Sequence, residues 1–210
     1  MRNIHFTGFL STGDYNSPGN YGLLDQSMAI NWVYDNIDAF NGDRHSITLF
    51  GPGAGAASAG LLMVAPRTRD RVTRVIAQSG SALADWALII DPYRAQNTSR
   101  VFGMMLGCSI ENSWKLVDCL YRGRSHSELG NAEFLPHVGL FPWGPVLDRN
   151  FTKPKDTWFH GWKQENWHFL NSTPEHLIKT GQFNRGLSYM TGVTTQEAAF
   201  MLCKYQRASF

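Results

Sequence analysis

Charged residues are scarce in this chain. Only 17% of its 210 residues are Asp, Glu, Lys or Arg, whereas 43% are hydrophobic and 13% are aromatic. This composition is typical of a packed globular chain and not of a disordered one. The net charge of +2 comes from basic and acidic residues that are interspersed, so the sequence lacks a stripe of one sign. We therefore do not expect nucleic acid as a partner.

Long apolar runs are also missing. The best stretch, residues 82–90, is about half of the ~18 residues that a membrane-spanning helix needs, and it contains Asp85. The first residues, from Met1 to Gly8, lack the continuous apolar core of a signal peptide. We therefore expect neither a transmembrane span nor a secretion signal in these residues, and taken alone this indicates a cytosolic chain.

No pattern typical of a metal site occurs. The chain has seven histidines, but the six considered as ligands show no i, i+4 pairing with a carboxylate partner on one helix. We expect them to lie in solvated loops, and we predict neither a metal nor another cofactor. These six are His45, His126, His137, His160, His168 and His176.

Only three cysteines are present. Cys108 and Cys119 are separated by a polar, helix-like stretch, and a disulfide between them would close a small loop worth roughly 2–3 kcal/mol. Two unrelated buried thiols explain the spacing about as well. Cys203 is left over, either free or paired outside this chain.

Three Asn-x-Ser/Thr sequons indicate a chain that passes through the secretory pathway. They begin at Asn97, Asn150 and Asn171, and none has proline in the middle. Chance alone accounts for some of them, so they support an extracellular location without establishing it.

Apolar periodicity and turn formers divide the chain into alternating strands and helices. Strands separated by helices predict an α/β fold whose mostly parallel sheet has helices on both faces. A long excursion, from about Asp91 to Asn184, separates the last two strands. The expected strands are residues 6–12, 46–50, 72–78 and 187–193, and the expected helices are residues 24–40 and 56–62.

A glycine motif, Gly51-x-Gly53-x-Gly55, lies between an expected strand and an expected helix and has two interpretations. A dinucleotide-binding loop uses such glycines around a phosphate, but it needs an acidic residue at the end of the next strand. That strand ends without one, at residues 77–80. The other interpretation is a nucleophile elbow, G-x-S-x-G, whose sharp turn lifts a serine above the sheet. Gly53 would then occupy the serine position.

Several separate motifs resemble the type-B carboxylesterase and cholinesterase family, in register and in order. The resemblance covers nearly the whole chain and implies a partial α/β-hydrolase fold. We expect residues 1–210 to be part of a carboxylesterase type-B domain that lacks the N-terminal strands and the C-terminal third. The motifs are residues 8–14, 18–26, 32–33, 46–51, 78–81, 145–148 and 192–197, together with the pair of Cys108 and Cys119.

The resemblance assigns a role to each position of the elbow. Gly53 stands where the family has its nucleophilic serine, and Pro52 stands where it has an acidic neighbour. Ala54 matches the residue whose amide helps to form the oxyanion hole, and Glu197 matches the acid of the triad. The catalytic histidine would lie beyond residue 210. Because glycine has no oxygen to attack a carbonyl, the resemblance implies a chain that is not an enzyme.

Two other serines lie close to the motif. Ser58 lies inside the following helix, and Ser79 lies at the end of the next strand, so neither occupies the exposed elbow. We do not expect either to replace the missing nucleophile.

The elbow resembles the non-catalytic branch of the family, which includes the neuroligins and gliotactin and acts in adhesion outside the cell. The resemblance implies an extracellular protein partner at a cell junction, with homo- and hetero-oligomers both open. It also implies a parent protein held at the outer face of the plasma membrane by a single span outside these residues. Two alternatives remain open: an active esterase with a misread codon 53, and a binding module that keeps a gorge for a hydrophobic ligand.

Overall fold

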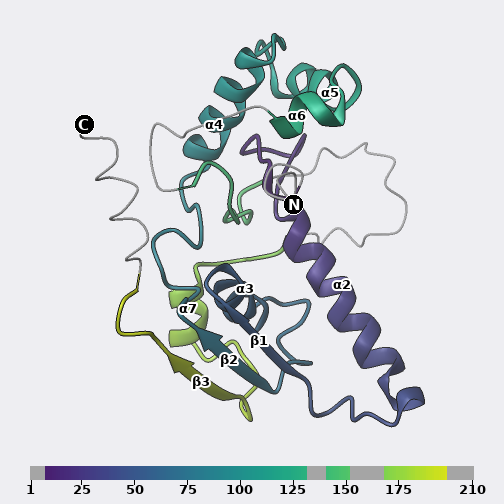
Figure 1. Cartoon of the computed structure of the whole chain (residues 1–210), viewed down its shortest axis with the longest axis vertical. Coiled ribbons are helices and arrows are strands. Elements are labelled where there is room, and N and C mark those ends of the chain that lie inside the picture. Colours follow the sequence, from purple (N-terminus) through teal and green to yellow (C-terminus); the bar gives the residue numbers. More distant parts are fainter. Residues whose placement is uncertain (1–7, 132–140, 152–167, 198–210) are drawn as a thin grey trace.

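The computed structural model describes residues 8–131, 141–151 and 168–197 (Figure 1). A three-stranded parallel sheet lies at one end of the molecule, and the helices of residues 92–131 lie at the other. The helices are α2 (Tyr21–Asn36), α3 (Ala54–Leu62), α4 (Pro92–Met105), α5 (Ser113–Arg122), α6 (His126–Asn131) and α7 (Pro174–Lys179), with a 3-10 turn η1 (Ile37–Phe40). The strands are β1 (Thr48–Pro52), β2 (Arg74–Gln78) and β3 (Ser188–Gly192).

The three strands lie in the order β1-β2-β3, and both pairs are parallel. Each strand falls within two residues of an expected one, which confirms the partial α/β-hydrolase architecture. The register aligns Leu49 with Val75, and Phe50 with Ile76 and Met190. Because side chains alternate along a strand, these two rows point to opposite faces of the sheet.

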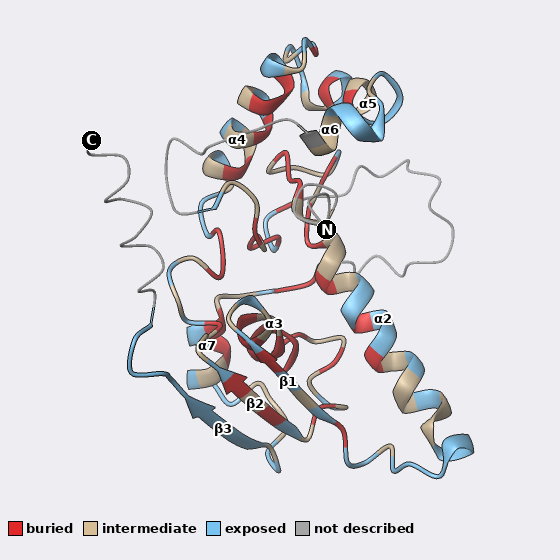
Figure 2. Cartoon of the chain, viewed as in Figure 1, coloured by how far each residue is buried: buried red, intermediate tan, exposed pale blue. Residues whose placement is uncertain are grey.

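The core lies on one face of this sheet. Val75 and Ala77 are buried beneath α3, whose small residues are buried along most of its length (Figure 2). On the opposite face Phe50 is 73% exposed and Met190 is 65% exposed. Among the described residues, no helix covers the row that contains Phe50.

The helix expected over residues 24–40 is present but changes its geometry near the end. Its regular part, α2, begins at Tyr21 and ends at Asn36, and η1 continues it to Phe40. Asn41 then adopts the left-handed conformation with φ 60°, which ends the helix as the Asn-Gly sequence predicts. Gly42 and the residues after it lead into β1.

The strand expected at residues 6–12 is not formed by residues 8–12. Leu10, Ser11 and Thr12 are buried, but they follow an irregular path whose polar groups are satisfied locally and by α4. The Thr12 amide donates to the Ser17 carbonyl at 2.9 Å, and the Ser99 hydroxyl donates to the Ser11 carbonyl at 2.5 Å. Buried backbone groups need partners, and hydroxyl groups here take the place of a neighbouring strand.

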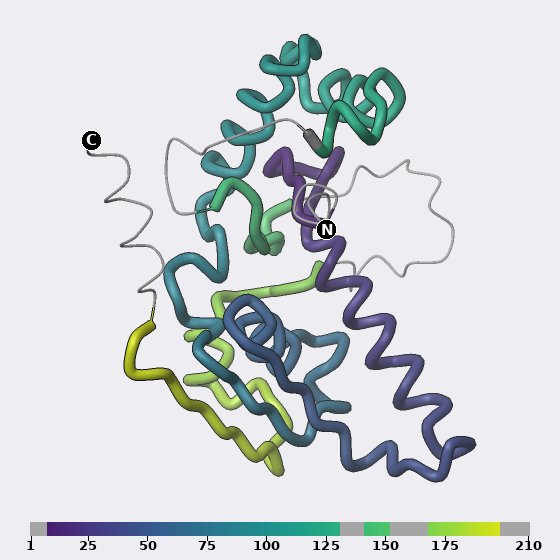
Figure 3. The backbone as a smooth tube through the Cα atoms, in the orientation of Figure 1, coloured from purple at the N-terminus to yellow at the C-terminus, as the bar shows by residue number. Residues whose placement is uncertain are grey.

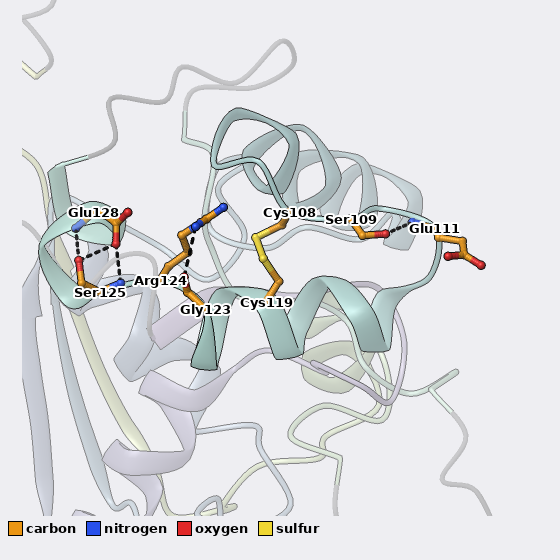
Figure 4. The surroundings of a disulfide bond; sticks show 8 residues. All are labelled: Cys108, Ser109, Glu111, Cys119, Gly123, Arg124, Ser125 and Glu128. Atoms are coloured by element: carbon orange, nitrogen blue, oxygen red, sulfur yellow. Dashed lines mark hydrogen bonds between the residues drawn. A yellow bond between two sulfur atoms is a disulfide. The ribbon is translucent and has the colours of Figure 1, made fainter.

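Helices α4, α5 and α6 of the excursion pack as a second, smaller layer. Phe102 on α4 and Leu116 and Leu120 on α5 form its core with Leu10. A disulfide joins Cys108, just after α4, to Cys119 on α5, with the two Cα atoms 5.8 Å apart (Figure 4). This cross-link holds α4 and α5 together over a separation of 11 residues.

Asn20 connects the N-terminal loop to the excursion, and the chain path brings the two together (Figure 3). Its side-chain amide donates to the Val146 carbonyl at 2.9 Å, and its side-chain oxygen accepts from the Val146 amide at 2.8 Å. Asn20 is fully buried and left-handed, with φ 62°. The Asn20 side chain therefore makes the pair of hydrogen bonds that a residue of a neighbouring strand would make. It joins segments 126 residues apart.

Replacing Asn20 with alanine leaves two buried backbone groups of Val146 without partners. We expect the free energy of unfolding to fall by roughly 2–4 kcal/mol, measured by denaturant titration. Asn36→Ala is the matched control, because the Asn36 side chain donates to the Trp32 carbonyl at an exposed position. It should change stability by about 0.5 kcal/mol or less, and equal losses in both variants would contradict the role of Asn20.

Candidate functional site

The candidate site begins at the turn between β1 and α3, where the elbow was expected. Gly53 connects the two with φ 55° and ψ −115°, a conformation that residues with a side chain rarely adopt. Its amide donates to the Gln78 carbonyl at 2.8 Å, and its carbonyl accepts from the Ala57 amide at 3.1 Å. The turn is thus held to β2 on one side and begins the helix on the other. Ala54 is the first residue of α3.

Glycines allow the close packing around this turn. A Cβ atom on Gly51 would lie 3.0 Å from the backbone of Gly55, and one on Gly80 would overlap the carbonyl oxygen of Gly53. Larger residues at these positions would push β2 and α3 away from the turn. The sharp strand-turn-helix geometry therefore depends on backbone contact between glycines.

The position of the missing side chain is open. A Cβ atom built on Gly53 meets no described atom within 4 Å. A Cβ atom there would therefore meet no steric obstacle from the described residues, and its local cost would be the positive φ. The place above Gly53, where an elbow would carry its serine, is open.

The ends of β2 and β3 bring Ser79 and Glu197 to the same edge of the sheet. The Ser79 amide donates to the Gly192 carbonyl at 2.8 Å, and Ser79 has φ 52°. Glu197 accepts from the Thr194 amide at 2.7 Å and shares a side-chain hydrogen bond with Ser79. The bond from Ser79, followed by the one from Thr194, holds the pKa of Glu197 below its usual value. The carboxylate is therefore ionised at neutral pH.

Gly53 follows β1 and Glu197 follows β3, so both lie at the carboxyl edge of the parallel sheet, with β2 between their strands. The prediction missed the hydrogen bond between Ser79 and Glu197. A signal for it was present, because both residues follow neighbouring parallel strands whose carboxyl ends share an edge. Ser58 lies within α3, is partly buried and is five residues beyond Gly53.

In the described part of the chain, Glu197 is held by Thr194 and Ser79 and not by a histidine. His45 lies in the loop before β1, His126 begins α6, and His176 lies on α7. Among the described residues there is also no group of three or more side chains suited to a metal. The remaining predicted histidines, His137 and His160, lie outside the described residues, as does Cys203.

A second carboxylate, Asp148, is buried within the excursion. It accepts from the Phe169 amide at 2.7 Å and from the Leu170 amide at 2.9 Å, which joins two segments of the chain. Burial raises the pKa of Asp148, while the two amides and nearby His168 oppose that rise. The sequence motif that contains Asp148 carried the resemblance but did not reveal this role.

The sequon asparagines Asn97, Asn150 and Asn171 are all exposed. Asn97 lies on α4, Asn150 lies in a turn two residues after Asp148, and Asn171 lies just before α7. No described helix is long and apolar enough to cross a membrane.

Comparison with known proteins gives one family. The chain matches the sequence profile of the Carboxylesterase family over residues 4–209. It is 34% identical to acetylcholinesterase of Bungarus fasciatus over 200 residues, which is 93% of this chain and 30% of that protein. It is 40% identical to neuroligin-2 of Rattus norvegicus over 141 residues, 67% of this chain and 16% of the relative. It is 41% identical to bile salt-activated lipase of Bos taurus over 152 residues, 69% of this chain and 25% of the lipase. The chain thus spans less than a third of the length of these relatives.

Gly53→Ala tests the strain at the elbow. A Cβ atom fits there without contact, so any loss of stability comes from the positive φ of 55°. We expect the free energy of unfolding to fall by about 1–3 kcal/mol in denaturant titration. Gly192→Ala is the matched control, because Gly192 also has open space but no positive φ. Its effect should be within about 1 kcal/mol of zero, and similar losses in both would argue against elbow strain.

Ser79→Ala tests the contact with Glu197. Because the pKa of Glu197 is lowered, its ionised form contributes stability at neutral pH that is lost as the pH falls through that lowered pKa. Removing the Ser79 hydroxyl should raise the pKa of Glu197, measured by NMR titration of its carboxyl carbon. Ser58→Ala should leave it unchanged. An unshifted pKa in Ser79→Ala would rule out the contact.

Proposed function

Because the chain belongs to the carboxylesterase family, we propose that it is part of a catalytically inactive, cholinesterase-like adhesion protein of the gliotactin type. One observation carries this proposal: the elbow is built in full, but its apex is Gly53. The acid position Glu197 is retained at the same edge of the sheet. A family member that keeps the fold but lacks the nucleophile is expected to act through protein contacts at its surface and not through ester hydrolysis.

The absence of a nucleophile at residue 53 is not compensated nearby. The Ser79 hydroxyl is engaged with Glu197, and Ser58 is part of a buried helix. Acyl transfer needs an oxygen held at the exposed turn, within reach of a base and of the oxyanion donors. Neither serine meets that condition, so the proposal assigns no catalytic residue to this chain.

Two features support an extracellular location. The disulfide between Cys108 and Cys119 is of a kind that persists in oxidising compartments. Asn97, Asn150 and Asn171 are exposed in sequons, where N-linked glycans would have room. We therefore propose that this domain lies at the outer face of the plasma membrane and carries glycans.

The proposed partner is another extracellular protein at a cell junction. A rigid α/β scaffold offers a large surface for protein contact once the site no longer turns over substrate. Homo- and hetero-association are both compatible with that surface. The proposal extends to the parent protein, since the chain spans less than a third of its relatives.

An active esterase with a serine codon at position 53 is the second candidate. It is favoured by one observation, the open space at Gly53 that would accept a serine side chain. The relatives also include a cholinesterase and a lipase by name. Genomic resequencing across codon 53 separates the two candidates, because a serine codon there removes the basis of the first.

The proposed inactivity predicts that the full-length protein neither hydrolyses a small acyl ester above background nor reacts with a fluorophosphonate probe. The reason is that residue 53 has no oxygen to acylate. Gly53→Ala should leave that background unchanged. A membrane-impermeant biotin reagent should label the same protein on intact epithelial cells at their contacts.

Either of two results would contradict the proposal. The first is measurable ester hydrolysis by the intact protein that Gly53→Ala does not alter, since another nucleophile would then be at work. The second is protection of the domain from the impermeant reagent on intact cells and labelling only after the cells are opened.

A further inference from the structure

The outward side of α4 carries one line of exposed residues, the α4 stripe, which has an apolar side chain at each end and a sequon asparagine between them. Tyr93 is 76% exposed and Met104 is 51% exposed, and Asn97 and Arg100 between them are also exposed. These residues follow the spacing i, i+4, i+7 and i+11, so they lie along one line of the helix. The opposite side, which includes Phe102, packs into the core of the excursion.

Tyr93 and Met104 expose apolar surface that only a group attached to this side of α4, or bound to it, can cover. The opposite side of α4 is packed in the core, so the α4 stripe stays outward. Asn97 lies one helical turn from Tyr93 and about two turns from Met104. A bulky group on Asn97 would lie between the two apolar side chains.

We propose that Asn97 carries an N-linked glycan that shields Tyr93 and Met104 on the outer face of α4. This inference rests on the extracellular location given under Proposed function. In the transfer, the side-chain nitrogen of Asn97 bonds to the anomeric carbon of an oligosaccharide and loses one proton. The bond from that carbon to a lipid-linked diphosphate breaks, and the diphosphate leaves with the electron pair. The attached sugars are bulky and solubilising, and their C–H faces pack on aromatic rings.

The transfer must take place before α4 has folded. The third residue of the sequon, Ser99, is fully buried, and its hydroxyl donates to the carbonyl of Ser11. In the folded protein this hydroxyl is held inside the core, although Asn97 itself remains exposed. The glycan is therefore added to the growing chain, and folding then places it on the stripe.

Asn171 provides a matched comparison within the same chain. It is exposed in the sequon Asn171-Ser172-Thr173, but it lies in a loop before α7. The described residues 168–187 contain no exposed large hydrophobic side chain. A glycan on Asn171 has no apolar stripe to cover, so its loss should have no effect on surface hydrophobicity.

The test uses the natural full-length protein expressed in animal cells. Release of glycans by peptide:N-glycosidase converts each occupied asparagine to aspartate, and mass spectrometry of the peptides reads each sequon. We expect Asn97 and Asn171 to be occupied. Binding of a fluorescent apolar-surface dye should rise in Asn97→Gln and after trimming of the native glycan, but not in Asn171→Gln.

A double variant then shows which surface the dye binds. In a Tyr93→Ser, Met104→Gln background, loss of the Asn97 glycan should no longer raise dye binding. Thermal melts of all variants exclude unfolding as the source of fluorescence, and trimming of the folded wild-type protein repeats the test without any substitution.

Three results would overturn the inference, and they separate it from the proposed function. Occupancy of Asn171 with an unmodified Asn97 refutes only the glycan on α4. Unchanged dye binding in Asn97→Gln, with Asn97 occupied in the wild type, refutes only the shielding. Absence of glycan from all three sequons also refutes the proposed extracellular location.

Discussion

The close approach of the Gly53 carbonyl to Gly80 is the constraint on which the rest of the site depends. It brings the turn after β1 against the end of β2, and it lets α3 begin directly above the sheet. A Cβ atom on Gly80 would overlap the Gly53 oxygen, so the contact requires glycine at residue 80. It holds the end of β2, where Ser79 lies, against the turn.

In this chain the elbow keeps its backbone geometry although residue 53 is glycine. An enzyme holds a residue with a side chain at a positive φ, which costs free energy. Glycine at position 53 removes that cost and leaves the turn, the helix and the hydrogen bonds in place. The geometry of the turn and of α3 is therefore fully compatible with glycine at residue 53.

Buried polar groups join segments that lie far apart in the chain. Asn20 pairs with the backbone of Val146, Ser99 with the carbonyl of Ser11, and Asp148 with the amides of Phe169 and Leu170. The first two connect the N-terminal loop to the excursion, and the third connects two parts of the excursion. Each bond satisfies a backbone group that folding removes from water, and its position specifies how these segments meet.

The sequence by itself determined the three parallel strands and the helices near the elbow, because these features depend on local periodicity and turn chemistry. The disulfide between Cys108 and Cys119 followed from the family resemblance, since spacing alone left two interpretations. Only the tertiary structure decided that residues 8–12 form no strand, because their backbone groups pair with the nearby Ser17 carbonyl and with the hydroxyl of distant Ser99. It also decided that Ser79 meets Glu197 and that one face of the sheet lacks a described helix. Both depend on how the strands and layers are arranged in space, which no local sequence pattern encodes.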